Sequence, residues 1–302
     1  MAAEKYLFKT VNGDTLKGFS WKADKAKANL VIVTGMEEHS FRYNDFALFM
    51  NKNGFNVVCV DHYGQGENVD NIADLGKVPT SFFSKSVRNI DDIVKLQKEN
   101  GLPTYLFGHS MGSFMTQDYI QRFAKSVDKV VICGSNGPNA KTLFSLGWTI
   151  AKIVTTKKNR EKRAKLLEKL SLGAYVKAVK HRKTNCDWLS YNEANVHRYI
   201  EDPKCGGGST NGFYYEFLKG NARLFKKKFL AKISPDIHLF LIAGAEDPVG
   251  ANGKGPSALA KLYKKLGVKD VNLKIYDHMR HEILNEDKKQ EVYDDILAFY
   301  NK

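Results

Sequence analysis

The sequence predicts an α/β protein, with a mostly parallel sheet, helices on both of its faces and one inserted helical segment. Three observations lead to this fold class. Short apolar runs alternate with helical segments in residues 1–137 and again from residue 233. The pentapeptide Gly-His-Ser-Met-Gly (108–112) stands between a predicted strand and a predicted helix. The residues in between are helical in pattern and basic. A chain of 302 residues, 43% of them hydrophobic, can bury the core of one such domain.

The first two predicted strands, residues 6–10 and 16–21, form an antiparallel hairpin. Asn12-Gly13-Asp14 lies between them, and an Asn-Gly pair favours the tight turn that such a hairpin needs.

Strands and helices then alternate. Residues 30–33 (Leu-Val-Ile-Val) are continuously apolar, as expected of a strand that is buried on both faces. The later strands are predicted at residues 55–60, 105–107 and 129–133, and the helices between them at residues 43–53, 82–100 and 113–123. Parallel strands need such crossover helices, so the alternation predicts a parallel sheet.

The alternation stops after Asn136-Gly137-Pro138. Leu143, Leu146 and Ile150 recur at helical spacing, and a second helical stretch is predicted at residues 159–172. Strands at residues 237–243 and 271–276 and helices at residues 256–266 and 287–300 then complete the pattern, giving eight strands in all. We therefore expect an α/β core formed by residues 1–137 and 233–302. Residues 138–232 are expected to form a helical cap over the crevice at the strand ends, where such folds bind ligands.

The formal net charge of +14 lies in this middle segment, which has 21 Lys/Arg and 7 Asp/Glu. Neither a known nucleic-acid module nor a basic platform with stacking aromatics is present, so nucleic acid is not a predicted partner. Two interpretations remain open. The segment is either a solvated basic face or a surface that attracts anionic lipid or an anionic substrate.

The sequence also bears on compartment and cofactors. No run of 18 or more apolar residues occurs, and residues 1–6 lack the apolar stretch of a secretory signal, so a cytoplasmic location is expected. The four cysteines (Cys59, Cys133, Cys186 and Cys205) show no C-x-x-C spacing. We predict no metal and no organic cofactor, and the oligomeric state is left open.

Ser110 is the candidate nucleophile. A serine on a sharp strand-to-helix turn has its hydroxyl exposed at the top of the sheet, and the flanking glycines allow so tight a turn. A serine hydroxyl needs a base to take its proton and a carboxylate to orient that base. In a sheet of this kind the acid and then the histidine follow the serine in the chain.

The candidate acid is Asp247, which follows the strand at residues 237–243, with Glu246 as its rival. Asp247 is favoured because Pro248 fixes the loop directly after it. The candidate base is His281, in the loop after the last strand, and spacing alone does not separate it from His278. His109, inside the pentapeptide, is expected to point away from the base.

A tetrahedral intermediate needs two donors to its oxyanion. The backbone N–H of Met111, the residue after the nucleophile, is one candidate. The loop after residues 30–33 should supply the other, and Gly35 lets its backbone come close, so the N–H of Met36 is the second candidate.

Five motifs together resemble the monoacylglycerol lipase and lysophospholipase branch of the α/β-hydrolase superfamily, also grouped as serine aminopeptidase S33. They are Gly-Met-Glu-Glu-His-Ser-Phe-Arg-Tyr (35–43), Asp-His-Tyr-Gly-Gln-Gly (61–66), Gly-His-Ser-Met-Gly (108–112), Glu-Asp-Pro-Val (246–249) and Arg-His-Glu-Ile-Leu-Asn-Glu (280–286). The resemblance implies an α/β-hydrolase fold, the triad Ser110, Asp247 and His281, and the donors Met36 and Met111. It favours His281 over His278. Thr34 stands where the family usually has histidine.

The predicted function is hydrolysis of a lipid-like carboxylic ester, a monoacylglycerol or a lysophospholipid, through an acyl-enzyme. Two alternatives are an esterase for small soluble esters and a catalytically silent binding protein on the same fold.

Overall fold

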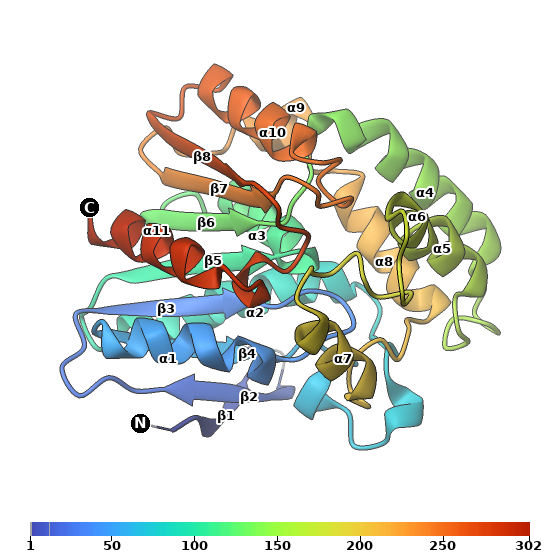
Figure 1. Ribbon diagram of the computed structural model, residues 1–302, viewed down its shortest axis with the longest axis horizontal. Coiled ribbons are helices and arrows are strands. Elements are labelled where there is room, and N and C mark those ends of the chain that lie inside the picture. Colours follow the sequence, from blue (N-terminus) through green and yellow to red (C-terminus); the bar gives the residue numbers. More distant parts are fainter. Residues whose placement is uncertain (1, 12) are drawn as a thin grey trace.

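The computed structural model describes residues 2–11 and 13–302 and contains one eight-stranded sheet (Figure 1). Across the sheet its strands are β1(Glu4–Lys9), β2(Thr15–Trp21), β4(Phe55–Val60), β3(Ala28–Val33), β5(Thr104–His109), β6(Lys129–Cys133), β7(His238–Gly244) and β8(Asp270–Tyr276). The pairs β1–β2 and β2–β4 are antiparallel, and the pairs from β4 to β8 are parallel. The predicted mostly parallel, eight-stranded sheet is confirmed. Asn12 of the predicted hairpin turn lies outside the described residues.

Helices cover both faces of the sheet, as predicted. One face packs against α1(Asn44–Lys52) and α11(Lys289–Asn301), which lie in front of the strands in Figure 1. The other face packs against α2(Phe82–Lys98), α3(Met111–Arg122) and α10(Lys254–Lys265). The central strand β3 is buried at all six positions, which explains its unbroken apolar run.

The inserted segment (residues 138–232) leaves the sheet after β6 and returns to it at β7. It contains α4(Lys141–Val154), α5(Lys165–Leu170), α6(Leu172–Ala178), α7(Glu193–Glu201), α8(Asn211–Asn221) and α9(Lys227–Leu230). In Figure 1, α4, α5, α6 and α8 lie on the right, opposite the two ends of the chain. The carboxyl ends of the parallel strands face these helices, so the loops that follow β3, β5, β7 and β8 meet beneath the inserted segment.

The predicted helix at residues 159–172 is wrong in extent. Its first residues form turns, because the Asn159 side chain makes hydrogen bonds to nearby backbone groups that compete with a helix. Oδ1 of Asn159 accepts from the Thr156 N–H at 2.7 Å, and its Nδ2 donates to the Val154 carbonyl at 2.9 Å. The helical part is then interrupted at Ser171, where the backbone leaves helical geometry at φ −103° and ψ −84°. Over the described residues, no helix has the length and apolar character needed to cross a membrane.

Candidate active site

Ser110 occupies a strained turn between β5 and α3. Its backbone has φ 53° and ψ −120°, a conformation that L-residues rarely adopt. The Ser110 N–H donates to the Cys133 carbonyl at 3.0 Å, which ties the turn to the neighbouring strand β6. A Cβ at Gly112 would lie 2.2 Å from the Val33 carbonyl oxygen, and a Cβ at Gly108 would lie 2.2 Å from the Thr116 hydroxyl. Both glycines are therefore required for the turn to sit this close to its neighbours.

Asp247 and His281 are brought together from the loops after β7 and β8. Nδ1 of His281 lies 3.0 Å from each carboxylate oxygen of Asp247, and both side chains are buried. Oδ1 of Asp247 also accepts from the Val249 N–H at 2.9 Å, which orients the carboxylate. Burial acts to lower the pKa of His281, but the Asp247 carboxylate outweighs it and the pKa is raised above its usual value.

The other ring nitrogen of His281 is left free for chemistry. Nε2 of His281 is buried and forms no hydrogen bond with the described residues. His281 and Ser110 line the same cavity. A base that is oriented on one side and unpartnered on the other, beside a serine, is the arrangement that activates a hydroxyl.

The two rival residues lie elsewhere. The side chains of Glu246 and His278 are 48% and 70% exposed, and Nδ1 of His278 lies 3.8 Å from Oε1 of Glu246. Tyr191 stacks on His278, with ring centroids 4.1 Å apart. The structure thus places Glu246 and His278 with each other at the surface, while Asp247 and His281 meet in the interior.

His109 does not point away from His281, so that expectation was wrong. The two ring centroids lie 4.7 Å apart. Gly134, at φ 58°, makes room for both rings, since a Cβ there would lie 3.1 Å from Cε1 of His281 and 3.2 Å from Cε1 of His109. Burial holds the pKa of His109 well below its usual value. His109 is therefore a neutral neighbour that adds no positive charge beside His281.

The loop after β3 approaches Ser110 closely. A Cβ at Gly35 would lie 3.1 Å from the Ser110 Cβ. Met36 and Met111 both line the cavity that contains Ser110. Within residues 2–11 and 13–302, neither Met36 nor Met111 donates its backbone N–H to a protein acceptor. Within the described residues, two backbone N–H groups without a protein acceptor thus belong to residues that line the same cavity as Ser110.

A buried charged network links this loop to the loop that carries His281. The Arg42 guanidinium binds both carboxylate oxygens of Glu282, at 2.5 and 2.7 Å, and lies 3.1 Å from Glu38. Although burial acts to raise the pKa of Glu282, Arg42 lowers it to about 2. Oε1 of Glu38 accepts from the Gly35 N–H at 2.5 Å and from the Tyr43 hydroxyl at 2.7 Å. Sequence reasoning did not identify this network.

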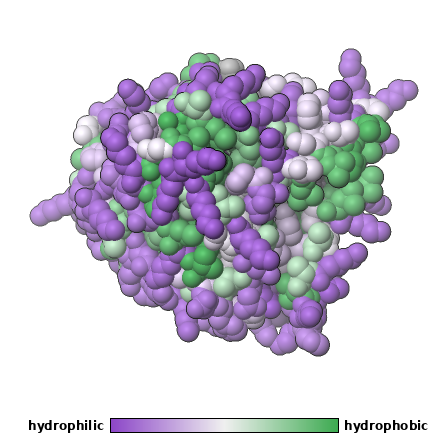
Figure 2. Space-filling model, turned by 90° about the horizontal axis from the view of Figure 1, so that it is seen from above, coloured by the Kyte–Doolittle hydropathy of each residue, from purple (hydrophilic) through white to green (hydrophobic). Residues whose placement is uncertain are grey.

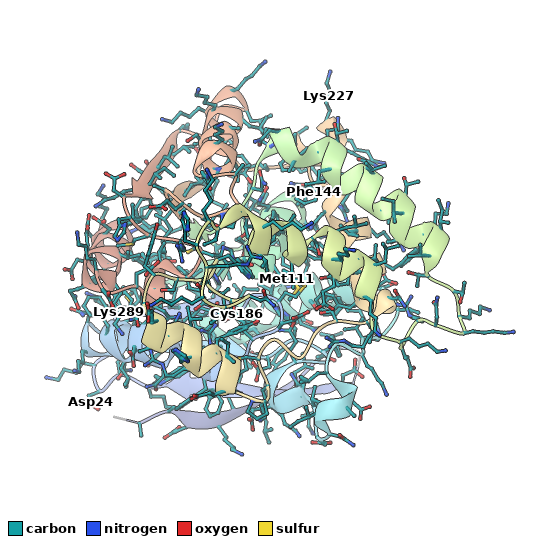
Figure 3. The ribbon with its side chains drawn as sticks, turned by 45° about the vertical axis from the view of Figure 1, so that its right-hand side comes forward. Asp24, Met111, Phe144, Cys186, Lys227 and Lys289 are labelled. Carbon is teal, nitrogen blue, oxygen red and sulfur yellow. The ribbon has the colours of Figure 1, made fainter. Side chains whose placement is uncertain are left out.

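The cavity above Ser110 has a volume of about 330 Å³ and is mostly apolar. Trp188 covers His281, with ring centroids 5.2 Å apart. In Figure 3, Met111 lies near the middle of the molecule, below the helix that carries Phe144. The side chains that the inserted segment contributes to the walls are largely aliphatic or aromatic, and include Leu143, Phe144, Leu146, Ile150, Leu167, Leu170, Tyr175, Phe217 and Leu218.

One group of side chains has the composition of a metal site. Ligand atoms of His39, Asp202 and Cys205 lie within 4.8 Å of one another. Nε2 of His39 already pairs with Asp202 at 2.7 Å, and burial raises the pKa of the Cys205 thiol, which keeps it protonated. A metal would need the thiolate, so the group fits a metal poorly. That the protein needs neither metal nor organic cofactor stays a prediction.

The eight-stranded sheet, with a serine at the turn after β5 and a histidine in the loop after β8, defines a serine hydrolase of the α/β-hydrolase fold. The chain belongs to the family described as "Serine aminopeptidase, S33", which matches residues 24–288.

Relatives and solved structures agree with this class. The chain is 24% identical to a monoacylglycerol lipase of Mycolicibacterium smegmatis over 98% of this chain and 96% of the relative. It is 27% identical to the human monoglyceride lipase, over 88% and 80% of the two chains. A crystal structure of a thermostable carboxyl esterase from Bacillus coagulans in complex with glycerol covers 100% of this chain and 98% of its own, at 28% identity and a TM-score of 0.85.

Proposed function

We propose that the protein hydrolyses a lipid-like carboxylic ester, a monoacylglycerol or a lysophospholipid, through an acyl-enzyme on Ser110. The observation that carries this proposal is the buried Asp247–His281 pair beside Ser110 at the base of an apolar cavity. The names of the relatives, among them two lipases for monoacylglycerols and a carboxyl esterase with bound glycerol, support the substrate class. The inserted segment acts as the cap that holds the acyl chain.

The proposed reaction has two halves. His281 Nε2 takes the proton of the Ser110 hydroxyl as its oxygen attacks the ester carbonyl, and the N–H groups of Met36 and Met111 bind the oxyanion. The intermediate collapses, His281 returns the proton to the departing alcohol, and the acyl group stays on Ser110. Water, deprotonated by His281, then attacks the acyl-enzyme, and this second intermediate collapses to the fatty acid as His281 returns the proton to the Ser110 oxygen. Asp247 stabilises the imidazolium in both halves.

Labelling by a fluorophosphonate probe tests the nucleophile directly. We expect the purified protein to react with the probe and the adduct to map to Ser110 by mass spectrometry. Heat-denatured protein is the control, because an unactivated serine does not react. An unlabelled native protein would support the alternative of a silent binding protein.

A series of p-nitrophenyl esters with acyl chains of increasing length tests the substrate class. An apolar cavity gains binding free energy with each methylene that it buries, about 0.8 kcal/mol for a fully buried one. We therefore expect kcat/KM to rise from short to medium-length chains. A maximum at two to four carbons would instead favour an esterase for small soluble esters.

The surface of the inserted segment suggests contact with an anionic membrane. Exposed apolar side chains stand there among lysines, and Ile153 of α4 is 74% exposed. The others on this segment are Leu143, Leu146, Leu166, Leu170 and Ile200. Figure 2 shows hydrophobic side chains gathered toward the right-hand end, the side where Figure 1 places α4 and α5, with hydrophilic side chains around them. Leu143, Leu146 and Leu170 also line the cavity, so its apolar wall continues to this surface.

Co-sedimentation with vesicles tests this contact. We expect more binding to phosphatidylserine-containing vesicles than to neutral ones, with binding reduced by added salt. The double variant Lys157→Glu/Lys158→Glu should weaken it. The control variant Lys25→Glu/Lys98→Glu makes the same change in charge on the surface of the α/β core, outside the inserted segment, and should not weaken binding. Equal binding to both kinds of vesicle would leave the basic face with a role in solubility alone. A cytoplasmic location stays a prediction.

A further inference from the structure

Glu37 is an unusual residue for its position. It directly follows Met36 in the loop after β3, and its backbone is left-handed, with φ 60°. That region favours glycine, because a side chain there is strained. Glu37 is also only 8% exposed, so a carboxyl group has been buried beside the proposed oxyanion donors. Contacts with the rest of the protein must stabilise this conformation.

Most of those contacts come from the inserted segment. The Ser209 hydroxyl donates to Oε1 of Glu37 at 2.9 Å. The backbone carbonyl of Glu37 accepts two further hydrogen bonds, one from the Tyr199 hydroxyl and one from the Gly206 N–H, each at 3.0 Å. On the core side, the Glu37 N–H donates to the Gln65 amide oxygen at 3.2 Å. The backbone of Glu37 is thus held from both sides, its N–H by the core and its carbonyl by the inserted segment, and the inserted segment also holds its side chain.

We propose that Glu37 is a positioning residue that ties the loop after β3 to residues 199–209 and so holds the Met36 N–H toward Ser110. This inference rests on the proposed function, since it assigns a role in the same reaction. Its consequence is that the oxyanion donor is set by the inserted segment as well as by the core. A movement of that segment when an acyl chain enters the cavity would reach Met36 through Glu37.

The charge on Glu37 is part of this contact. Burial raises the pKa of the carboxyl group to about 7. The ionised carboxylate accepts from the Ser209 hydroxyl, and protonation weakens it as an acceptor. Several titratable or charged groups face it from the elements around it, namely Arg163, Glu168, Cys186, Tyr199, Lys204 and Tyr214. Of these, Glu168 acts to raise and Arg163 to lower its pKa.

Three variants separate the carboxyl group from the backbone. Glu37→Gly removes the side chain but suits the left-handed backbone, so the protein is expected to fold. Ser209→Ala removes the partner. We expect each to lower kcat for p-nitrophenyl butyrate about tenfold, with KM changed less than twofold, because a displaced donor weakens transition-state binding and not substrate binding. The double variant should lose no more than either single variant. Glu37→Gln keeps a neutral, weaker acceptor for Ser209, as the protonated carboxyl group does, and should lower kcat at pH 8 by less than Glu37→Gly.

The pH profile distinguishes a positioning role from a merely structural one. In the wild type, kcat/KM falls as His281 gains a proton and falls further as Glu37 does, so the slope of log kcat/KM should exceed one over the pH range in which Glu37 titrates. Glu37→Gln should show a slope of one, because only His281 then titrates. Glu193→Gln, a 65% exposed carboxylate of the inserted segment, is the matched control and should keep the wild-type profile.

Several results would overturn the proposal. The first is a Glu37→Gly variant whose kcat stays within twofold of the wild type, or in which only KM changes. The second is a double variant in which the losses of kcat caused by Glu37→Gly and Ser209→Ala multiply. The third is an identical slope of the pH profile for the wild type and Glu37→Gln. Each leaves the proposed function intact, since the wild type still turns over. If the wild type hydrolyses no ester, the rate of Ser110 labelling by a fluorophosphonate replaces kcat in the same variants. If it is not labelled either, the proposed function fails and this inference fails with it.

Discussion

Replacing Ser110 with alanine is expected to lower kcat for p-nitrophenyl butyrate by about a millionfold, which is the loss seen when a serine nucleophile of this type is removed. The reason is that the acyl group has no other acceptor. Nε2 of His281 is unpartnered within the described residues and lines the same cavity as Ser110. Without the hydroxyl, His281 could only activate water directly, and the oxyanion donors would contribute what catalysis remains.

Steady-state kinetics on purified variants measures this loss, and two controls make it interpretable. Ser84→Ala changes an exposed serine of α2 and should keep wild-type turnover. The unfolding temperature of Ser110→Ala should stay near that of the wild type, because alanine strains the same turn no more than serine does. Undiminished hydrolysis by a folded Ser110→Ala variant would remove the acyl-enzyme from the proposal.

The fold was readable from the sequence because local pattern and burial agree along the sheet. The six positions of β3 are buried and apolar, and Gly54 and Gly101 stand at the ends of α1 and α2 with positive φ. The error at residues 159–172 has the opposite cause. The helical spacing of leucines there is real, but the Asn159 side chain and the break at Ser171 depend on local hydrogen bonds that apolar spacing does not report.

The site was readable only in part. Each proposed triad residue follows a strand of the sheet, so chain order and turn chemistry predict that they gather at one edge. The network of Glu38, Arg42 and Glu282 was missed because Arg42 and Glu282 lie 240 residues apart, and sequence spacing does not pair such distant residues. A signal was present, since all three lie in the motifs that carry the family resemblance. Glu37 lies in the same motif as Glu38 and Arg42, but its role could not be predicted, because its left-handed backbone and its contact with Ser209 exist only in the folded chain.

Replacing Asp247 with asparagine is expected to lower kcat by about 10⁴-fold with little change in KM. The carboxylate accepts from Nδ1 of His281, which places the free lone pair on Nε2, toward Ser110. An asparagine amide can donate to Nδ1 instead, which moves the proton to Nε2 and leaves the base unable to accept the serine proton. Asparagine has nearly the same shape as aspartate, so the loss of kcat reports the wrong tautomer of His281 together with the missing negative charge.

The pH profile of kcat/KM gives this prediction a second readout. Asp247 is the largest influence that raises the pKa of His281, and burial alone lowers it. Removing the charge should therefore lower the pKa of His281, and the acidic limb of the profile, where activity is lost as His281 gains a proton, should move to lower pH. Glu246→Gln changes the adjacent, exposed carboxylate and should leave both kcat and the limb in place. If Glu246→Gln shifts the limb and Asp247→Asn does not, the acid has been assigned to the wrong residue.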